Sequence, residues 1–381
     1  MTPHCPVSHS AQALERLRSC ITVSMPKANN FDLVRLLAAL QVVVSHCAHH
    51  LGVGHRYSPL FSFTSLFPGV PIFFFISGFL ISRSYENNPV IGEFALNRIL
   101  RIYPALIVCF AVSLALVAMS GYFSHQAVPP LEALLWSVGQ LSFVQFYNPE
   151  FMRHFGVGVL NGSMWTITVE LQFYVLIPLL YALLHLLKPP GKQQSRALLG
   201  AVLVFVVANL AYSAAAAHYA HALWYRLAGV SFIPWFYMFL IGVVFQRHFE
   251  MLHAWLGGRF VPMLIVYILL AWGCGGVLGW SLGNDLNPIL STALCALTFA
   301  AAFSGTGLAD KLLSRNDLSY GVYIYHMPMV NFLLAIGLGG ATRSFLVAIA
   351  ATLLLSYGSW RVVEKPALRF KQHALYQHEK A

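Results

Sequence analysis

A series of long apolar stretches constrains this chain more than any other feature. A helix needs about 20 apolar residues to cross the hydrocarbon core of a bilayer, and ten stretches of about this length follow one another. They lie at residues 31–50, 66–84, 102–121, 164–187, 197–217, 228–246, 260–280, 287–304, 320–339 and 344–363. We therefore predict an all-α fold, a polytopic membrane bundle of about ten transmembrane helices.

The composition excludes the main soluble classes of protein. Charged residues make up 9% of the 381 residues and hydrophobic residues 58%, whereas soluble domains carry roughly 25% charged residues. So few charges cannot cover a soluble enzyme of this size, and no Lys/Arg-rich run of the nucleic-acid-binding kind occurs. The six cysteines are scattered without metal-ligand spacing. We expect neither a nucleic-acid partner nor a bound metal.

An eleventh stretch, residues 131–147, is short and contains polar residues, so it could be a re-entrant or interfacial helix. Loop charge decides whether it spans, because Lys and Arg concentrate in cytoplasmic loops. If it does not span and the N-terminus is cytoplasmic, all but four of the 23 Lys and Arg residues fall on the cytoplasmic side. If it spans, this bias largely vanishes. We therefore predict ten spans with both termini in the cytoplasm.

The same topology gives the domain organisation. We expect a cytoplasmic N-terminal tail at residues 1–27, a single membrane domain at 28–366 and a cytoplasmic C-terminal tail at 367–381. The formal charge of +10 is then a topology signal.

Ionisable residues inside the predicted spans are candidates for function, because burying them in a bilayer is costly. Asp32 and Arg35 are three residues apart on the first span and can pair on one helix face. His46 follows Arg35 by eleven residues, or three turns, so it lies on the same face about 16 Å further along. Taken alone, Arg35 could reach lipid headgroups and His46 could be a structural polar group.

Glu170 lies about two turns below the outer end of the fourth span, at a depth similar to that of His46. A carboxylate that accepts a hydrogen bond from histidine fixes its tautomer and stabilises the imidazolium, as a general base requires. We predict a His46–Glu170 catalytic pair. The alternative is a structural polar pair that joins two helices.

Two further groups lie near the predicted cytoplasmic side. Arg98 and Arg101, at the mouth of the third span, have guanidinium groups that suit phosphate oxygens, although topology anchors would show the same spacing. His326, in a Tyr-rich segment before Pro328, lies about 10 Å inside the bundle. Aromatic stripes of this kind are more often packing than pocket.

These residues fall in motifs that resemble those of the integral-membrane acyltransferase family 3. Arg35 and His46 are similar to its R-x10-H motif, and Arg98, Arg101, Tyr103 and Pro104 to its RxxR-x-YP element. The other similar segments are residues 73–80 (FFFISGFL), 165–174 (WTITVELQFY) and 360–366 (WRVVEKP). Leu171 departs from the pattern, because a second acid often occupies that position, so Glu170 would act alone there. The chain resembles the subgroup of this family without an SGNH-type domain.

The resemblance implies a bacterial inner-membrane O-acyltransferase. It would move an acyl group, most simply acetyl, from cytoplasmic acetyl-CoA to a hydroxyl of an extracytoplasmic carbohydrate. Such an acceptor would be the O-antigen of lipopolysaccharide, another surface polysaccharide or a lipid-linked oligosaccharide. In this hypothesis Arg35, Arg98 and Arg101 hold the coenzyme A phosphates, and His46, oriented by Glu170, is the general base. Ser77, Tyr174 and Tyr325 are candidate donors to the oxyanion.

Two alternatives stay open from the residues alone. A proton-coupled exporter or lipid-linked sugar flippase would also bury His, Glu and Arg in a bundle. The same acyl transfer could also serve a macrolide or a Nod-type oligosaccharide, because no pocket residue identifies a sugar.

Overall fold

The computed structural model of the protein describes residues 26, 28–285, 287–314 and 316–369. These residues form helices joined by loops, with no strand among them. The long helices are α2 (Phe31–His50), α4 (Gly69–Asn87), α5 (Ile91–Met119), α7 (Trp165–Leu183), α8 (Lys192–Tyr219), α10 (Phe236–Arg247), α12 (Phe260–Ala271), α13 (Pro288–Ala302), α15 (Ser319–Ala335) and α16 (Thr342–Ser359). The tails expected at 1–27 and 367–381 lie almost wholly outside the described residues.

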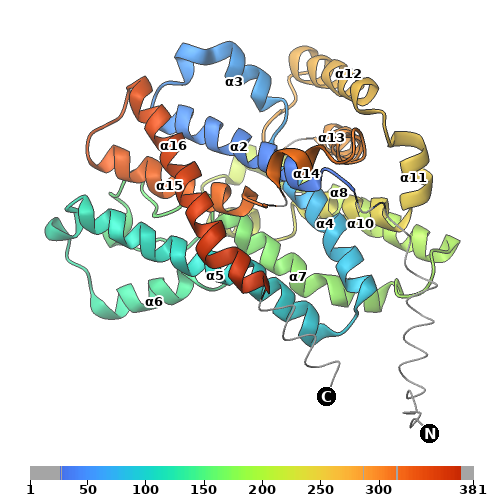
Figure 1. Ribbon diagram of the computed structural model, residues 1–381, viewed down its shortest axis with the longest axis horizontal. Helices are drawn as coiled ribbons and strands as arrows, with labels where there is room; N and C mark the ends of the chain where they lie inside the picture. Colours follow the sequence, from blue (N-terminus) through green and yellow to red (C-terminus); the bar gives the residue numbers. More distant parts are fainter. Residues whose placement is uncertain (1–25, 27, 286, 315, 370–381) are drawn as a thin grey trace, which may run out of the picture.

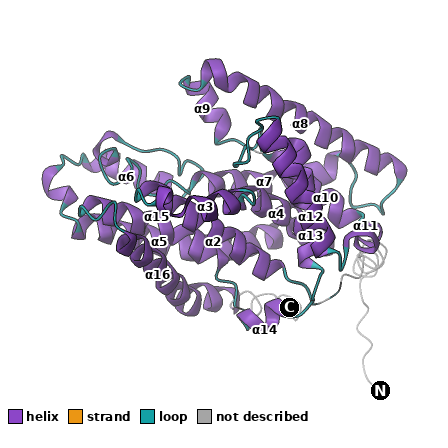
Figure 2. Ribbon diagram, turned by 90° about the horizontal axis from the view of Figure 1, so that it is seen from above, coloured by secondary structure: helices purple, strands orange, loops and turns teal. Residues whose placement is uncertain are grey.

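Short helices connect these elements. They are α3 (Ser58–Ser65), α6 (Pro130–Gln140), α9 (Leu223–Gly229), α11 (Phe249–Leu256) and α14 (Leu308–Leu313), with 3₁₀ turns at Gly54–Tyr57, Tyr122–His125 and Glu150–Met152 and π-helical turns at Trp272–Val277 and Trp360–Glu364. Figure 1 shows α5, α15 and α16 on one side of the bundle and α11 to α13 on the other, with α2, α4 and α7 between them. In Figure 2, α8 and α9 stand apart at the periphery.

The predicted polytopic helical membrane fold is confirmed, because each of the ten predicted spans coincides with one long helix. Seven helical stretches of the described chain are long and apolar enough to cross a bilayer. The other three, α10, α13 and α15, have 12, 15 and 17 residues and bury most of them inside the bundle.

Residues 131–147 do not form a spanning helix. α6 has 11 residues, which is about 17 Å at 1.5 Å per residue, and turns follow it to residue 147. Its apolar side chains Leu131, Leu134, Leu135 and Val138 are all exposed, while Trp136 packs against Phe110 of α5 and against Phe151. This pattern fits the interfacial alternative for this stretch.

Two glycines let α4 and α10 approach backbone to backbone. A Cβ atom built on Gly78 would lie 1.9 Å from the carbonyl oxygen of Phe239, and one on Gly242 would lie 2.2 Å from that of Phe75. No larger residue fits at either position without moving a helix. This contact fixes α4, and with it Ser77, in the centre of the bundle.

Helix α15 is almost entirely buried and packs between α2 and α16. Pro328 has no N–H group, so the carbonyl of Ile324, four residues earlier, loses its helical partner. Asn161 replaces that partner by donating from Nδ2 to the Ile324 oxygen at 2.8 Å. Asn161 lies in the turn before α7 and is buried.

The segment before α7 descends along α15. Asn331 accepts a hydrogen bond from the amide of Val157 and donates to the carbonyls of Val159 and Leu160, and Asn161 reaches Ile324, seven residues earlier on α15. Seven helical residues correspond to about 10 Å. As a result α7 begins well inside the bundle and not at its surface.

Candidate active site

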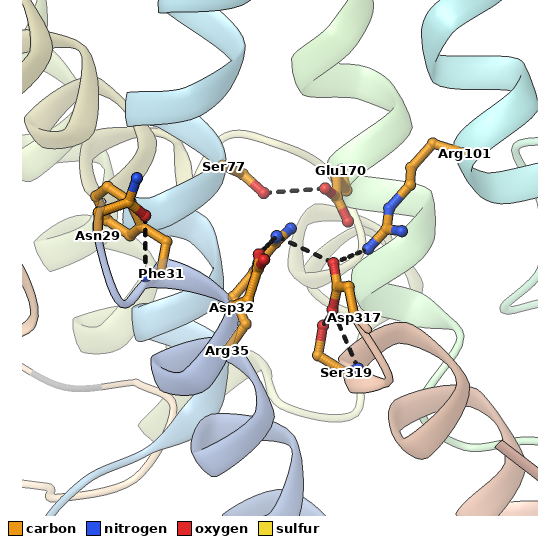
Figure 3. A network of polar contacts seen from close by, with 9 residues as sticks. All are labelled: Asn29, Phe31, Asp32, Arg35, Ser77, Arg101, Glu170, Asp317 and Ser319. Atoms are coloured by element: carbon orange, nitrogen blue, oxygen red, sulfur yellow. Dashed lines mark hydrogen bonds and ion pairs between the residues drawn. The ribbon is translucent and has the colours of Figure 1, made fainter. Parts of the chain in front are cut away.

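Two arginines from different helices share one carboxylate. Arg35 of α2 and Arg101 of α5 both contact Asp317, which lies just before α15 (Figure 3). The Arg35 contact is 3.0 Å long, and Arg35 also pairs with Asp32, as the i,i+3 spacing predicted. The cluster therefore ties together α2, α5 and the start of α15 at one end of the bundle, which we call the arginine end.

Asp317 is held as a carboxylate. The backbone amide and Oγ of Ser319 donate to its Oδ1 at 3.2 and 2.5 Å, and its side chain is only 10% exposed. Burial opposes ionisation, but Arg101, Arg35 and the Ser319 hydrogen bonds outweigh it and hold the pKa of Asp317 well below its usual range. The negative charge between the arginines is thus permanent at physiological pH.

A cavity of about 110 Å³ lies beside this cluster. Six of the residues selected from sequence line it together, and they come from α2, α4, α5 and α7: Arg35, Ser77, Arg98, Arg101, Glu170 and Tyr174. Phe73, Thr166, Tyr320 and Tyr323 form more of its wall. Residues spread over 140 positions of the chain thus meet around one space.

Arg98 is the cation of this cavity that no carboxylate neutralises. Its guanidinium lies 5.7 Å from the ring centroids of both Phe94 and Tyr174, and no ion pair joins it to any described residue. The Nε atoms of Arg98 and Arg35 are buried without a hydrogen-bond partner. Buried donors without partners are costly, and these two atoms could each donate to an acceptor oxygen that entered the cavity.

Glu170 contacts hydroxyl groups, not the predicted histidine. Its Oε1 accepts hydrogen bonds from Ser77 Oγ at 2.9 Å and from Tyr174 OH at 2.6 Å, and Figure 3 shows it beside the arginine cluster. The predicted His46–Glu170 pair is therefore wrong. Ser77 and Tyr174, considered as oxyanion donors, instead direct their hydroxyls to this carboxylate.

The depth estimate for Glu170 failed for a physical reason. It assumed that α7 starts at the outer surface, whereas the segment before α7 descends along α15 and places the first turn of α7 deep in the bundle. Thr166, in that turn, is hydrogen-bonded to Tyr323 OH at 2.7 Å. Glu170, one turn further, therefore lies level with the arginines and not with His46.

His46 pairs with the other histidine that the sequence analysis selected. Its Nδ1 lies 2.9 Å from Nε2 of His326, and Nδ1 of His326 lies 2.6 Å from the backbone oxygen of Tyr323. His326 is fully buried. Neither histidine lines the arginine cavity, but Tyr323 does, and its ring centroid is 5.9 Å from that of His326. The histidine pair thus lies directly beyond one wall of the cavity.

Tyr325 lies outside the arginine cavity. It is buried on α15, does not line the arginine cavity, and its hydroxyl interacts with Ser359 of α16. Its selection as an oxyanion donor is therefore not supported by its position. No group of three or more His, Cys, Asp or Glu residues suited to a metal ion occurs in the part of the chain that the structure describes.

Sequence reasoning missed Asp317 and Tyr323. Asp317 lies in a loop, where a charge carries no membrane cost, so nothing distinguished it from a solvated residue. The one available signal was its position two residues before a helix that begins with serine, where an aspartate commonly accepts local hydrogen bonds. Tyr323 was one of several tyrosines on α15, and only the fold separates the residue facing the cavity from the others.

A buried arginine-lined cavity beside a histidine pair in a polytopic helical bundle agrees with the motifs noted above. The chain belongs to the acyltransferase domain family, which it matches over residues 29–361, and it is a membrane-bound acyltransferase. This membership favours acyl transfer over the alternative of an exporter or flippase.

Three curated proteins place the chain among its relatives. It is 33% identical to Nodulation protein 10 of Rhizobium leguminosarum bv. viciae over 361 residues, covering 90% of this chain and 94% of that protein. It is 29% identical to the O-acetyl transferase of Shigella phage Sf6 over 353 residues, covering 90% and 96%. A 159-residue region is 27% identical to Peptidoglycan O-acetyltransferase OatA of Listeria monocytogenes, covering 39% and 23%. No solved structure matches the chain.

Proposed function

We propose that this protein is an O-acetyltransferase of a bacterial inner membrane that moves acetyl from cytoplasmic acetyl-CoA to a carbohydrate hydroxyl outside. Two of its relatives are named O-acetyltransferases, and one of these names carries peptidoglycan, a carbohydrate polymer. The observation that carries the proposal is the arrangement of the two sites. An arginine-lined cavity and a buried histidine pair lie next to one another, with Tyr323 in the cavity wall against His326.

The arginine cavity is the proposed donor site. Arg98 has no carboxylate partner, and the unpartnered Nε atoms of Arg98 and Arg35 would donate to phosphate oxygens of acetyl-CoA. The cavity is much smaller than coenzyme A, so the phosphates would bind at the arginine end while the narrow pantetheine arm enters. Under the orientation predicted from loop charge, this end faces the cytoplasm.

His46 is the proposed general base. It would take the proton from the acceptor hydroxyl while that oxygen attacks the thioester carbonyl and coenzyme A leaves as the thiolate. The same histidine would then return its proton to the thiolate, which releases coenzyme A as the thiol. Base catalysis of this kind contributes about 10² to 10⁴ in rate.

A layer of side chains around Tyr323, which lines the cavity and lies against His326, faces the histidines. The ring of Phe73 packs against that of Tyr323 at 5.4 Å, and Tyr323 is hydrogen-bonded to Thr166. The thioester must pass this layer to reach His46, so the proposal requires these side chains to move when the donor binds.

Analysis of the surface glycan tests the proposal. A strain lacking this protein is complemented with wild type or with His46→Ala, and the purified polysaccharide is compared by proton NMR and mass spectrometry. We expect an acetyl mass that is present with wild type and absent with His46→Ala at equal membrane levels of protein. Full acetylation by His46→Ala would remove His46 from the mechanism, and an unchanged glycan in the deletion strain would reject the acceptor class.

A further inference from the structure

We propose that His326 is a positioning residue that fixes the tautomer of His46, so that Nδ1 of His46 carries the proton and Nε2 presents a free lone pair to the acceptor hydroxyl. The inference rests on the proposed function, in which His46 is the base. It assigns to a second histidine the role that a carboxylate has in a Ser-His-Asp triad.

The first step is the proton on His326. Its Nδ1 lies 2.6 Å from the backbone oxygen of Tyr323, and a carbonyl oxygen can only accept a hydrogen bond. Nδ1 of His326 must therefore be the donor. The ring is fully buried, where a positive charge is costly, so it is neutral and its Nε2 is left as an acceptor.

The second step is the proton on His46. Nε2 of His326 faces Nδ1 of His46 at 2.9 Å. Since Nε2 of His326 carries no proton, the hydrogen bond forms only if His46 Nδ1 donates. A neutral imidazole has one N–H group, so Nε2 of His46 is unprotonated. The two hydrogen bonds that begin at the Tyr323 carbonyl thus determine that Nε2 is the basic atom of His46.

The third step concerns how rigidly α15 holds His326. α15 is held at two adjacent residues by the start of α7, because Tyr323 is hydrogen-bonded to Thr166 of α7 and Asn161 satisfies the carbonyl freed by Pro328. His326 has little freedom to rotate within this packing. When His46 accepts a proton, its Nδ1–H still donates to a neutral acceptor, so the imidazolium is stabilised by a dipole without a buried counter-charge.

Two substitutions separate positioning from packing. His326→Gln keeps a side-chain oxygen that can accept from His46 Nδ1, whereas His326→Leu has a similar size but no acceptor. Purified variants are assayed for kcat and for the KM of acetyl-CoA. We expect His326→Leu to lower kcat by about 10² or more with an unchanged KM, and His326→Gln to recover at least tenfold of that loss. Equal kcat in both variants, or a loss confined to KM, would overturn the inference.

Nitrogen-15 NMR reads the tautomer without relying on activity. Protein labelled at histidine is compared with His46→Ala to assign the His46 signals. We expect a protonated Nδ1 and an unprotonated Nε2 in wild type, and loss of that preference in His326→Leu. A protonated Nε2 on His46 in wild type would contradict the inference. If instead His46→Ala is fully active, His46 is not the base of the proposed function. An inactive His46→Ala together with a protonated Nε2 in wild type rejects this inference alone, and the two failures are thereby distinguished.

Discussion

The three arginines of the cavity differ in the charge that surrounds them. Arg35 and Arg101 are held by Asp317, whose carboxylate is ionised at physiological pH, and Arg35 is held by Asp32 as well. These two arginines therefore hold helices together through their ion pairs even when no ligand is bound. Arg98 has no such partner, and its position against Phe94 and Tyr174 leaves its donors available.

Arg98→Gln should weaken binding of the donor more than it weakens the fold. Loss of a charge-assisted hydrogen bond costs about 1.5–3 kcal/mol, so we expect the Kd for acetyl-CoA to rise by roughly 10- to 100-fold. Binding by calorimetry in detergent measures it. Arg226→Gln, an exposed arginine on α9, is the matched control and should leave Kd unchanged. Equal affinities for wild type and Arg98→Gln would make Arg98 a topology anchor.

The helices themselves were predictable from sequence, and their irregular connections were not. A span is a local property, because about 20 apolar residues satisfy their backbone groups within one helix and need no particular neighbour. The descent of the segment before α7 depends on hydrogen bonds from residues 157–161 to Asn331 and Ile324 of α15, more than 160 residues away in the chain. Because of these contacts, Glu170 lies more than one helical turn deeper than predicted, and it does not pair with His46.

Which side chains pair with one another within the sites could not be predicted from the local sequence either. Nine residues selected from sequence lie in the cavity, in the ion cluster or in the histidine pair, most of them because an ionisable side chain in or near a span is conspicuous. Sequence reasoning paired His46 with the acid and not with His326, since depth estimates along separate helices ignore how the helices tilt and begin. Asp317 was not selected, because a charged residue in a loop is not conspicuous in the way that one inside a span is.

Asn161 and Pro328 should behave as a coupled pair at the level of the helix. Asn161→Ala leaves the Ile324 carbonyl without its donor, which costs about 1–3 kcal/mol, and we expect a lower melting temperature in detergent. Pro328→Ala restores the N–H that can bond that carbonyl within α15. The double variant Asn161→Ala/Pro328→Ala should therefore regain part of the loss. Strictly additive effects of the two changes would show that the Asn161 bond does not compensate for the proline.

The whole molecule places two chemically different sites along the axis of one bundle. Arg35 and His46 are separated by three turns of α2, so the arginine end and the histidine pair are about 16 Å apart along that helix. Tyr323, in one layer with Phe73 and Thr166, lines the arginine cavity and has its ring 5.9 Å from that of His326. A donor bound at the arginine end and an acceptor arriving from the other side would meet at this layer. Neither substrate would then have to cross the whole bilayer.

The sidedness of acetyl transfer tests this account most directly. Right-side-out and inside-out membrane vesicles containing the protein and its glycan acceptor are supplied with radiolabelled acetyl-CoA, which does not cross the bilayer. We expect the label to appear in the glycan only when acetyl-CoA meets the cytoplasmic face, and not with His46→Ala on either face. Label transferred equally from both faces, or retained with His46→Ala, would contradict the account.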